Sequence, residues 1–553
     1  MRTAESNRSF HASALERLHA LRREYATAGS EEAVARQHAK KKLTVHERLD
    51  LLLDPGAARF EIGTFAAFGI YDDDHGDIRS AGVRTFAGVI SGHDCVVIAN
   101  DSMVKSGTWF PLTIEKILRA QEIALENRLP VVYLVDSGGL FLPLQRDTFA
   151  GREHAGRIFY NNARISAAGV PQIAAVMGPC VAGGAYVPAL CDELIMVEGT
   201  SGIYLAGPYL VRAAVGEKTD SETLGGATTH ARLSGMADYV DADDRGALER
   251  VRRLARPWPE PRDAGYPREE ARAPAVEPEA LLDLLPGDRR VAYDMREVLL
   301  TFVDAGSLEE YKAEFGRSLI AATARLDGRV IGIVASQRLS AKSGAGELQI
   351  GGVIYADAAD KAARFVLDMN QKGVPLLFVQ DVTGFMVGTR AERGGIIKDG
   401  AKLVSAVSNS RVPKLTLIAG NSYGAGNYAL CGRAFGPRFV VAWPTAQIAV
   451  MGGEQAAETI AGIQRAAAAR GGPRTRTGAG NDTQNDAQAT DEEELARIRE
   501  SYETTTSPYY AAARLWIDAI IDPRETRAVL SHIFRLACRV EPGPDFRLGV
   551  YQV

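Results

Sequence analysis

An internal duplication is the feature that most constrains the fold of this chain. The segment EKILRAQEIALENRLPVVYLVDSGG (115–139) returns 245 positions later as DKAARFVLDMNQKGVPLLFVQDVTG (360–384). Each copy has the period of an amphipathic helix, then a turn, then an apolar run typical of a strand buried in a parallel sheet. The match resumes between VPQIAAVMGPCVAGGAY (170–186) and VPKLTLIAGNSYGAGNY (412–428). A repeat of this length indicates a duplicated domain rather than a solenoid.

The duplication predicts the fold class α/β, with two domains built on mainly parallel sheets. A chain of 553 residues is also too long for a single core. Residues 255–290 are rich in proline and charge, as an interdomain linker should be. We therefore expect an N-terminal domain over 1–260, a linker over 261–290 and a C-terminal domain over 291–553. The polar, glycine-rich stretch 470–494 is expected to be a surface insertion.

Composition excludes several classes of protein. The net charge of −5 gives no general attraction to nucleic acid or to an anionic membrane. The N-terminal segment is charged and lacks the apolar core of a signal peptide, and no apolar run is long enough to span a membrane. The five cysteines include no CxxC pair, which argues against a zinc ribbon and for free thiols in a reducing compartment. We expect a cytoplasmic protein without a metal.

Two equivalent turns of small residues form the candidate site. Gly183 and Gly184 in the first copy correspond to Ala425 and Gly426 in the second, each between a strand-like run and a helix start. The start of a helix leaves N–H donors unpaired, and small residues let a substrate oxygen approach them. An oxyanion hole can be made in this way without a charged side chain. Close packing of helix on strand is the competing explanation and accounts for part of the pattern.

Other chemistries have weaker support. The GAGNYALCG stretch lacks the third glycine of a dinucleotide-binding loop, because Ala429 stands there. No G-x-S-x-G elbow for a serine hydrolase is present. Cys180 corresponds to Ser422 in the other copy and has no histidine nearby in sequence, which favours a packing thiol. His230 fits a structural role better than a catalytic one.

Long stretches of the chain resemble the carboxyltransferase (β) subunits of biotin-dependent acyl-CoA carboxylases, above all the 3-methylcrotonyl-CoA and geranyl-CoA carboxylase group. They include GRIFYNNARISAAGVPQIAAVMGPCVAGGAYVPALCDE, LGGATTHARLSGMADY, GGIIKDGAKLVSAVSNSRVPK and NSYGAGNYALCGRAFGPRFVVAWP. The similarity runs from about residue 45 to the end, apart from the linker and the insertion. It implies two crotonase-like (ClpP/crotonase) domains, the N-terminal one binding acyl-CoA and the C-terminal one binding carboxybiotin.

The resemblance also implies roles for individual residues. Gly183 and Gly184 would hold the thioester oxyanion of the acyl-CoA enolate, and Ala425 and Gly426 the ureido oxygen of biotin. The other residues that it assigns to acyl-CoA binding are Gly138, Gly139, Ala182, Tyr204 and Gly207. Those that it assigns to biotin binding are Gly384, Phe385, Tyr423, Gly424 and Asn427.

The cofactor and the partners follow from the same resemblance. The chain contains no Met-Lys-Met biotinylation motif and no recognisable ATP-grasp segment, so biotin is expected on a partner chain, the biotin carboxylase/biotin carboxyl carrier (α) subunit. The active site is expected between the N-terminal domain of one copy and the C-terminal domain of another, in a homohexameric core. The expected substrate is 3-methylcrotonyl-CoA or a related branched or unsaturated acyl-CoA. No nucleic acid and no membrane are expected as partners.

Some positions depart from the family pattern and leave the acyl group open. Leu140 and Phe141 stand where small or polar residues are common, and Tyr204 and Tyr209 add bulk beside the expected acyl pocket. The segment 338–365 resembles propionyl-type and decarboxylase-type relatives. Three alternatives therefore remain, namely the carboxyltransferase subunit of a glutaconyl-CoA-type decarboxylase, a non-catalytic scaffold paralogue and a crotonase-type hydratase.

Overall fold

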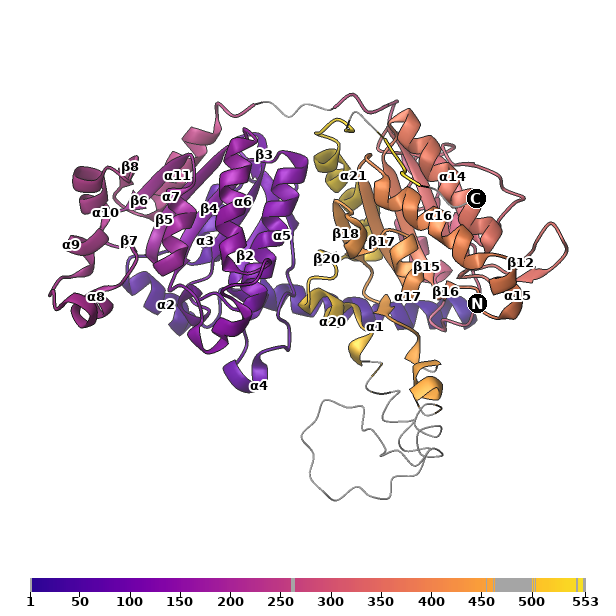
Figure 1. Ribbon diagram of the computed structural model, residues 1–553, viewed down its shortest axis with the longest axis horizontal. Helices are drawn as coiled ribbons and strands as arrows, with labels where there is room; N and C mark the ends of the chain where they lie inside the picture. Colours follow the sequence, from indigo (N-terminus) through magenta and orange to yellow (C-terminus); the bar gives the residue numbers. More distant parts are fainter. Residues whose placement is uncertain are drawn as a thin grey trace, which may run out of the picture.

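The structure is a computed structural model in which two sheets of eight strands lie side by side (Figure 1). It describes residues 2–259, 264–453, 455–460, 462, 500, 502, 504–543 and 546–550. The expected insertion at 470–494 lies outside the described residues, as do positions 260–263 of the chain.

The first sheet is built mainly from parallel strands of the first sequence copy. Its order is β1 (Phe60–Glu61), β2 (Val83–Ile90), β3 (His93–Asn100), β4 (Val131–Ser137), β5 (Gln172–Val181), β6 (Glu193–Val197) and β8 (Tyr239–Asp241), with β7 (Gly202–Tyr204) paired to β5. The β1–β2 and β2–β3 pairs are antiparallel, and every later pair is parallel. Strands β3 and β4 are buried along their whole length, which agrees with the apolar runs CVVIA and VVYLV that they contain.

The second sheet repeats this order. It runs β9 (Glu309–Glu310), β10 (Leu319–Leu326), β11 (Arg329–Ser336), β15 (Leu376–Val382), β17 (Lys414–Tyr423), β18 (Phe439–Ala442) and β20 (Ala519–Ile520), with β19 (Gln447–Ala449) paired to β17. A register irregularity between β4 and β5 at Val135/Ser137 returns between β15 and β17 at Gln380/Val382. The predicted duplication and the α/β class are confirmed.

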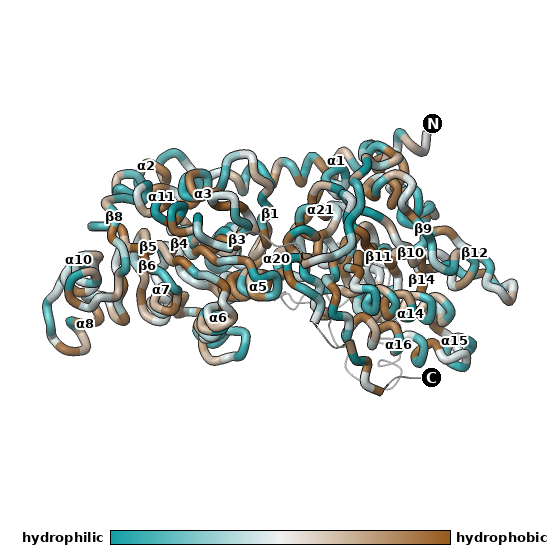
Figure 2. Tube along the Cα trace, turned by 90° about the horizontal axis from the view of Figure 1, so that it is seen from above, coloured by the Kyte–Doolittle hydropathy of each residue, from teal (hydrophilic) through white to brown (hydrophobic). Residues whose placement is uncertain are grey.

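Matched helices join the strands. Helices α5 (Pro111–Asn127) and α14 (Ala356–Lys372) both end at a left-handed residue, Arg128 and Gly373. Seen from above, α6 (Ala155–Ala167), α7 (Tyr186–Ala189) and α16 (Ile396–Asn409) lie along one side of the molecule (Figure 2). Helices α1 (Arg2–Tyr25), α2 (Glu31–Ala39) and α3 (Val45–Leu52) lie along the other side. The two copies therefore present equivalent helices to the same side.

The remaining elements are short or lie at the ends of the sheets. The other helices are α4 (Asp72–His75), α8 (Pro208–Val215), α9 (Ser221–Gly225), α10 (Ala227–Thr229), α11 (Asp244–Ala255), α12 (Leu281–Leu284), α13 (Met295–Leu299), α15 (Thr389–Arg393), α17 (Gly424–Ala429), α20 (Pro508–Ala513) and α21 (Thr526–Ala537). Four two-residue strands complete the set: β12 (Ala341–Lys342), β13 (Leu348–Gln349), β14 (Val353–Ile354) and β16 (Gly384–Phe385). In the described part of the chain, no helix has the length and apolar character needed to cross a membrane.

One apolar core runs through the junction of the two halves. The rings of Phe60 and Phe439 meet edge to face with centroids 5.5 Å apart, and both belong to a buried cluster with members from each sheet. Helix α1 crosses to the second half, where Arg22 donates to the carbonyl of Ile520 at 2.9 Å. The halves are thus joined by far more than the linker, and the domain limits at 260 and 291 stay a prediction.

Candidate functional site

The two turns singled out in the sequence have the same backbone conformation. Each begins with an extended residue, Val181 at φ −114° and Tyr423 at φ −111°, and neither turn has a side-chain cap. The next residue is left-handed in both copies, Ala182 at φ 56° and Gly424 at φ 52°. Since the first N–H groups of a helical turn have no intrahelical partner, each turn offers backbone donors without a competing side-chain acceptor.

Packing beneath the turns differs between the copies. A Cβ built on Gly184 would lie 4.0 Å from the nearest atoms, which belong to Cys180 and Trp109. A Cβ built on Gly426 would lie 2.7 Å from a methyl of Val382 and 3.3 Å from the Cα of Gly384. Close packing therefore explains the glycine at 426 but not the glycine at 184.

Two other glycines are required by packing. A Cβ on Gly178 would fall 2.0 Å from the carboxylate oxygen of Asp136, and one on Gly420 would fall 2.4 Å from the Cγ of Asp381. These matched pairs lie on the central strands just before the turns. The sequence shows that these glycines and aspartates repeat between the two copies, but it does not show that each glycine is needed to make room for an aspartate side chain.

The two buried aspartates anchor the strand ends through different partners. Asp136 accepts from Lys42 at 2.7 Å and from Arg48 at 3.0 Å. Asp381 accepts from the Tyr293 hydroxyl at 2.8 Å and from the backbone N–H of Asn421 at 2.8 Å. Burial lowers the pKa of Lys42, and burial together with Asp381 holds the pKa of Tyr293 well above its usual value. The carboxylates are committed to these contacts and position the turns.

The predicted acyl-CoA residues gather around the first turn. The carbonyl of Gly139 accepts from the N–H of Trp109 at 2.8 Å, and a Cβ on Gly139 would lie 3.3 Å from the carbonyl oxygen of Val181. Gly138 precedes it and donates to the carbonyl of Ser106 at 3.0 Å. This loop therefore borders the turn directly.

Tyr204 lies on β7, which pairs with the C-terminal end of the interior strand β5, and its ring packs over two glycines. Its ring is 2.9 Å from a Cβ built on Gly202 and 3.7 Å from one built on Gly207. Tyr209, by contrast, is almost fully exposed. Phe141 stacks on Phe110 with ring centroids 4.3 Å apart, so its bulk fills an aromatic cluster. Sequence reasoning missed Trp109 and Phe159, which form the wall beneath the first turn.

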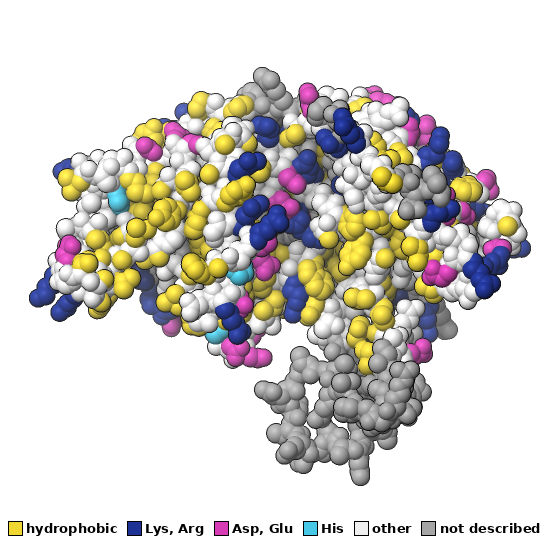
Figure 3. Space-filling model, in the orientation of Figure 1, with side chains coloured by type: hydrophobic (Ala, Val, Ile, Leu, Met, Phe, Trp, Pro, Cys, Tyr) yellow, Lys and Arg dark blue, Asp and Glu magenta, His cyan; other side chains and the backbone are white. Residues whose placement is uncertain are grey.

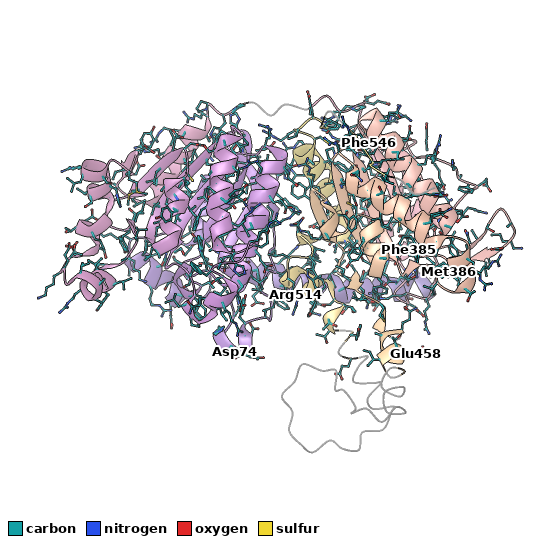
Figure 4. The ribbon with its side chains drawn as sticks, viewed as in Figure 1. Asp74, Phe385, Met386, Glu458, Arg514 and Phe546 are labelled. Carbon is teal, nitrogen blue, oxygen red and sulfur yellow. The ribbon has the colours of Figure 1, made fainter. Side chains whose placement is uncertain are left out.

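The predicted biotin residues divide into two groups. Gly384 lies against the second turn, with φ 135° and no described atom within 4 Å of a built Cβ. Phe385 and Met386 follow it at the front of the second half (Figure 4). The ring of Phe385 reaches back to Gly400 of α16, whose built Cβ would be 3.0 Å from it.

The other predicted biotin residues have side chains that turn inward. Tyr423 is buried, and its hydroxyl donates to Gln447. Asn427 donates to the hydroxyl of Ser422 at 2.7 Å, in a network with Gln380. The side chains of Tyr423 and Asn427 are therefore engaged within the protein, and only their backbone groups are left to contact a ligand at the turn.

Hydrophobic side chains gather on the face of both halves that Figure 3 presents. The first half exposes Tyr186, Leu190, Leu205, Tyr209 and Leu210, and the second half exposes Val387, Ile397, Tyr428 and Val450. Helix α7, which follows the first turn, and α16, which packs on the helix of the second turn, lie along the same side of the chain (Figure 2).

Side chains with acid–base or nucleophilic chemistry are committed elsewhere. Burial raises the pKa of the Cys180 thiol to about 12, the opposite of what a thiolate nucleophile needs. His230 contacts the carbonyl of Ile203 and the hydroxyl of Ser234, each at 2.8 Å. Within the described ranges, no cluster of three or more His, Cys, Asp or Glu side chains could hold a metal ion. The chemistry that this face can offer is backbone hydrogen bonding in an apolar setting.

The sequence and the structure of this chain are both similar to those of known proteins. The carboxyl transferase domain family matches residues 36–541. The chain is 45% identical to the biotin-dependent 3-methylcrotonyl-coenzyme A carboxylase beta1 subunit of Mycobacterium tuberculosis, over 96% of this chain and 94% of that protein. It is 42% identical to the mitochondrial methylcrotonoyl-CoA carboxylase beta chain of Dictyostelium discoideum, over 95% and 85%. The crystal structure of the geranyl-CoA carboxylase beta subunit of P. aeruginosa is similar, with a TM-score of 0.84 and 33% identity over 100% of this chain and 97% of that one.

Proposed function

This chain belongs to the carboxyl transferase family, and from that premise we propose that it is the carboxyltransferase subunit of a biotin-dependent acyl-CoA carboxylase acting on 3-methylcrotonyl-CoA or a related branched, unsaturated acyl-CoA. The observation that carries the proposal is the pair of equivalent turns, which offer uncapped backbone donors on one apolar face. Two equivalent sites of backbone N–H donors suit a reaction with two substrates, each of which develops negative charge on an oxygen.

The first turn would act on the acyl-CoA. The N–H groups of Gly183 and Gly184 would donate to the thioester oxygen as it gains charge, which lowers the barrier to forming the enolate. Removing one such donor typically costs about 10²–10³ in rate. Leu140 and the Trp109–Phe159 wall would limit the acyl group, and they are the residues to vary in a search for the true substrate.

The second turn fits biotin. Open space beside Gly384 and exposed apolar side chains such as Val387 and Val450 suit a bicyclic ring with one polar edge. The N–H groups of Ala425 and Gly426 would donate to the ureido oxygen. Biotin, held on a partner chain that also carries the biotin carboxylase, would supply the carboxyl group. The remaining work of this chain is to orient both reactants and exclude water.

The geometry calls for more than one copy of the chain. Helices α7 and α17, at the two turns, lie in different halves of the chain, so one chain does not bring the turns together (Figure 1). Two copies placed face to face would bring the first turn of one opposite the second turn of the other. This supports a homo-oligomeric core, for which we propose a hexamer, bound to an α subunit in the cytoplasm.

The proposal is tested by carboxyl transfer with the biotinylated partner. Fixation of labelled bicarbonate is followed over a panel of 3-methylcrotonyl-, geranyl-, propionyl- and glutaconyl-CoA. We expect Gly184→Val to lose about 100-fold or more in rate, because its branched side chain displaces the donor. Gly184→Ala is the matched control, since its methyl fits. Wild-type rates in Gly184→Val would remove the first oxyanion site, and turnover only in the decarboxylating direction would favour the glutaconyl-CoA alternative.

A further inference from the structure

A cavity lies beside the second of the two buried aspartates. It has a volume of about 420 Å³, with its open mouth included, and its walls come mainly from α1, from residues 285–293 and from the end of β17. Figure 2 shows α1 on the side of the molecule opposite to α14 and α16. A ligand in the cavity would therefore lie on the α1 side of the second sheet.

The first half shows how the charges around such an aspartate can balance. Asp136 accepts from Lys42 and Arg48. The Nε of Arg48 also donates to a second carboxylate, that of Asp244, at 2.8 Å. All four side chains are buried. Two cations and two carboxylates thus form a neutral network.

The second half lacks one of these carboxylates. Asp381 lies 3.3 Å from the Nε of Arg338, whose Nη2 donates to the carbonyl of Arg289 at 2.6 Å. The equivalent of Asp244 is Thr526, because each is the first residue of a 12-residue helix that follows the edge strand of its sheet. The two helices also bury matching positions, namely Leu248, Val251 and Ala255 in α11 and Leu530, Ile533 and Ala537 in α21. Two arginines therefore share one carboxylate.

Arg289 is the cation that is left without a partner of opposite charge. Its Nη1 donates to Oδ1 of Asn421 at 3.1 Å and its Nη2 donates to the carbonyl of Thr445, and both acceptors are neutral. No carboxylate of the described residues lies within ion-pair distance of this guanidinium. Asp288, the preceding residue, is exposed and pairs with Arg290. Burial lowers the pKa of Arg289, which reflects the cost of holding this charge away from water.

The wall of the cavity consequently carries one positive charge in excess. Burial and the charge of Arg289 lower the pKa of His11, so this third basic group of the wall is uncharged at neutral pH. Water in the cavity could satisfy hydrogen bonds, but only an anion would also compensate the charge.

We propose that the cavity binds a small oxyanion, a phosphate or a carboxylate, in the role that the second carboxylate has in the first half. The Arg289 guanidinium has five N–H donors, of which the bonds to Asn421 and Thr445 use two, so donors are left for the oxygens of the anion. The bound anion would connect α1, residues 285–293 and β17, and so stabilise the folded chain. The site is built from one chain and does not rest on the proposed reaction.

The experiment is a calorimetric titration of the full chain, without acyl-CoA or biotin, at an ionic strength held constant with chloride. Inorganic phosphate and acetate are titrated separately, which shows whether a phosphate or a carboxylate is the better ligand. We expect Arg289→Met to weaken binding about tenfold or more, because it removes a charged donor. Asn421→Asp should weaken it as much, since it places a carboxylate beside Arg289 without a change of size. Arg290→Met, at the exposed neighbour, is the matched control and should bind like the wild type.

Circular dichroism shows whether each variant is folded, and Asn421→Asp decides the test if Arg289→Met does not fold. Saturable binding of either anion, lost in Arg289→Met or Asn421→Asp and retained in Arg290→Met, supports the site. Binding of neither anion by the wild type, an unchanged affinity in a folded Arg289→Met or Asn421→Asp, or an equal loss in Arg290→Met overturns it.

Discussion

Placing one methyl group at equivalent positions of the two turns separates packing from chemistry. In Gly426→Ala the new methyl overlaps Val382, at 2.7 Å and 3.0 Å from its two methyls, and reaches within 3.3 Å of the Gly384 backbone. Val382 is fully buried in the second core and cannot swing aside. Overpacking of this kind costs about 1–3 kcal/mol.

The same methyl at Gly184 meets no such obstacle. Its nearest neighbours lie 4.0 Å away, at ordinary contact distance, and φ at this position is not left-handed. Replacing glycine by alanine then restricts the unfolded chain and stabilises the fold by about 0.4–1 kcal/mol. The two variants should therefore differ by about 1.5–4 kcal/mol, although the positions are equivalent in the repeat.

Scanning calorimetry of both variants measures this difference. One kcal/mol corresponds to about 2–4 °C in a domain of about 150–250 residues. We expect Gly426→Ala to melt several degrees below the wild type and Gly184→Ala to melt at or slightly above it. Equal melting temperatures, or a lower one for Gly184→Ala, would refute the claim that packing requires a glycine only in the second copy.

Three further predictions concern stability. Burial lowers the pKa of Lys116 to about 7, so between pH 7 and 10.5 the unfolded chain binds a proton that the folded chain lacks. The free energy of unfolding therefore rises by about 1.4 kcal/mol per pH unit in this range. Urea titrations at several pH values should show that Lys116→Met lacks this rise. Arg119→Met leaves Asp518 buried without its partner, so we expect a loss of about 3–5 kcal/mol in denaturant unfolding, and a loss below 1 kcal/mol would contradict the role of the pair. Ala182→Gly removes a Cβ from a left-handed residue and should raise stability by about 0.5–1 kcal/mol once the freer unfolded chain is counted, which the melting temperature checks.

The sequence predicted the architecture because the duplication is itself a pattern of residues. Matched runs such as 115–139 and 360–384 identify equivalent helices and strands without knowledge of any contact. The two turns were found in the same way. What could not be predicted is which side chains face inward, because Tyr423 and Asn427 belong to the turn in sequence but contact Gln447 and Ser422 in space.

The aromatic residues beneath the first turn could not be predicted from the sequence for a related reason. Trp109 and Phe159 lie in separate segments, and neither repeats with the turns. They meet beneath Gly183 and Gly184 only because the strand order places β3, β4 and β5 side by side. The spacing of Trp109 and Phe159 in the sequence does not predict that their side chains meet.

The continuous core at the junction bears on how such a chain arose. Before duplication, each single-copy polypeptide would have carried an equivalent of both α5 and the β18–β20 edge, and every contact between copies would have depended on the concentration of the polypeptide. Tethering two copies gives one contact of each pair an effective concentration fixed by the chain, commonly in the millimolar range for short links. In the present chain this contact is apolar and contains the buried pair Phe60 and Phe439. A junction that is never exposed on a free subunit can be built from apolar side chains, so the tether and the aromatic contact support each other.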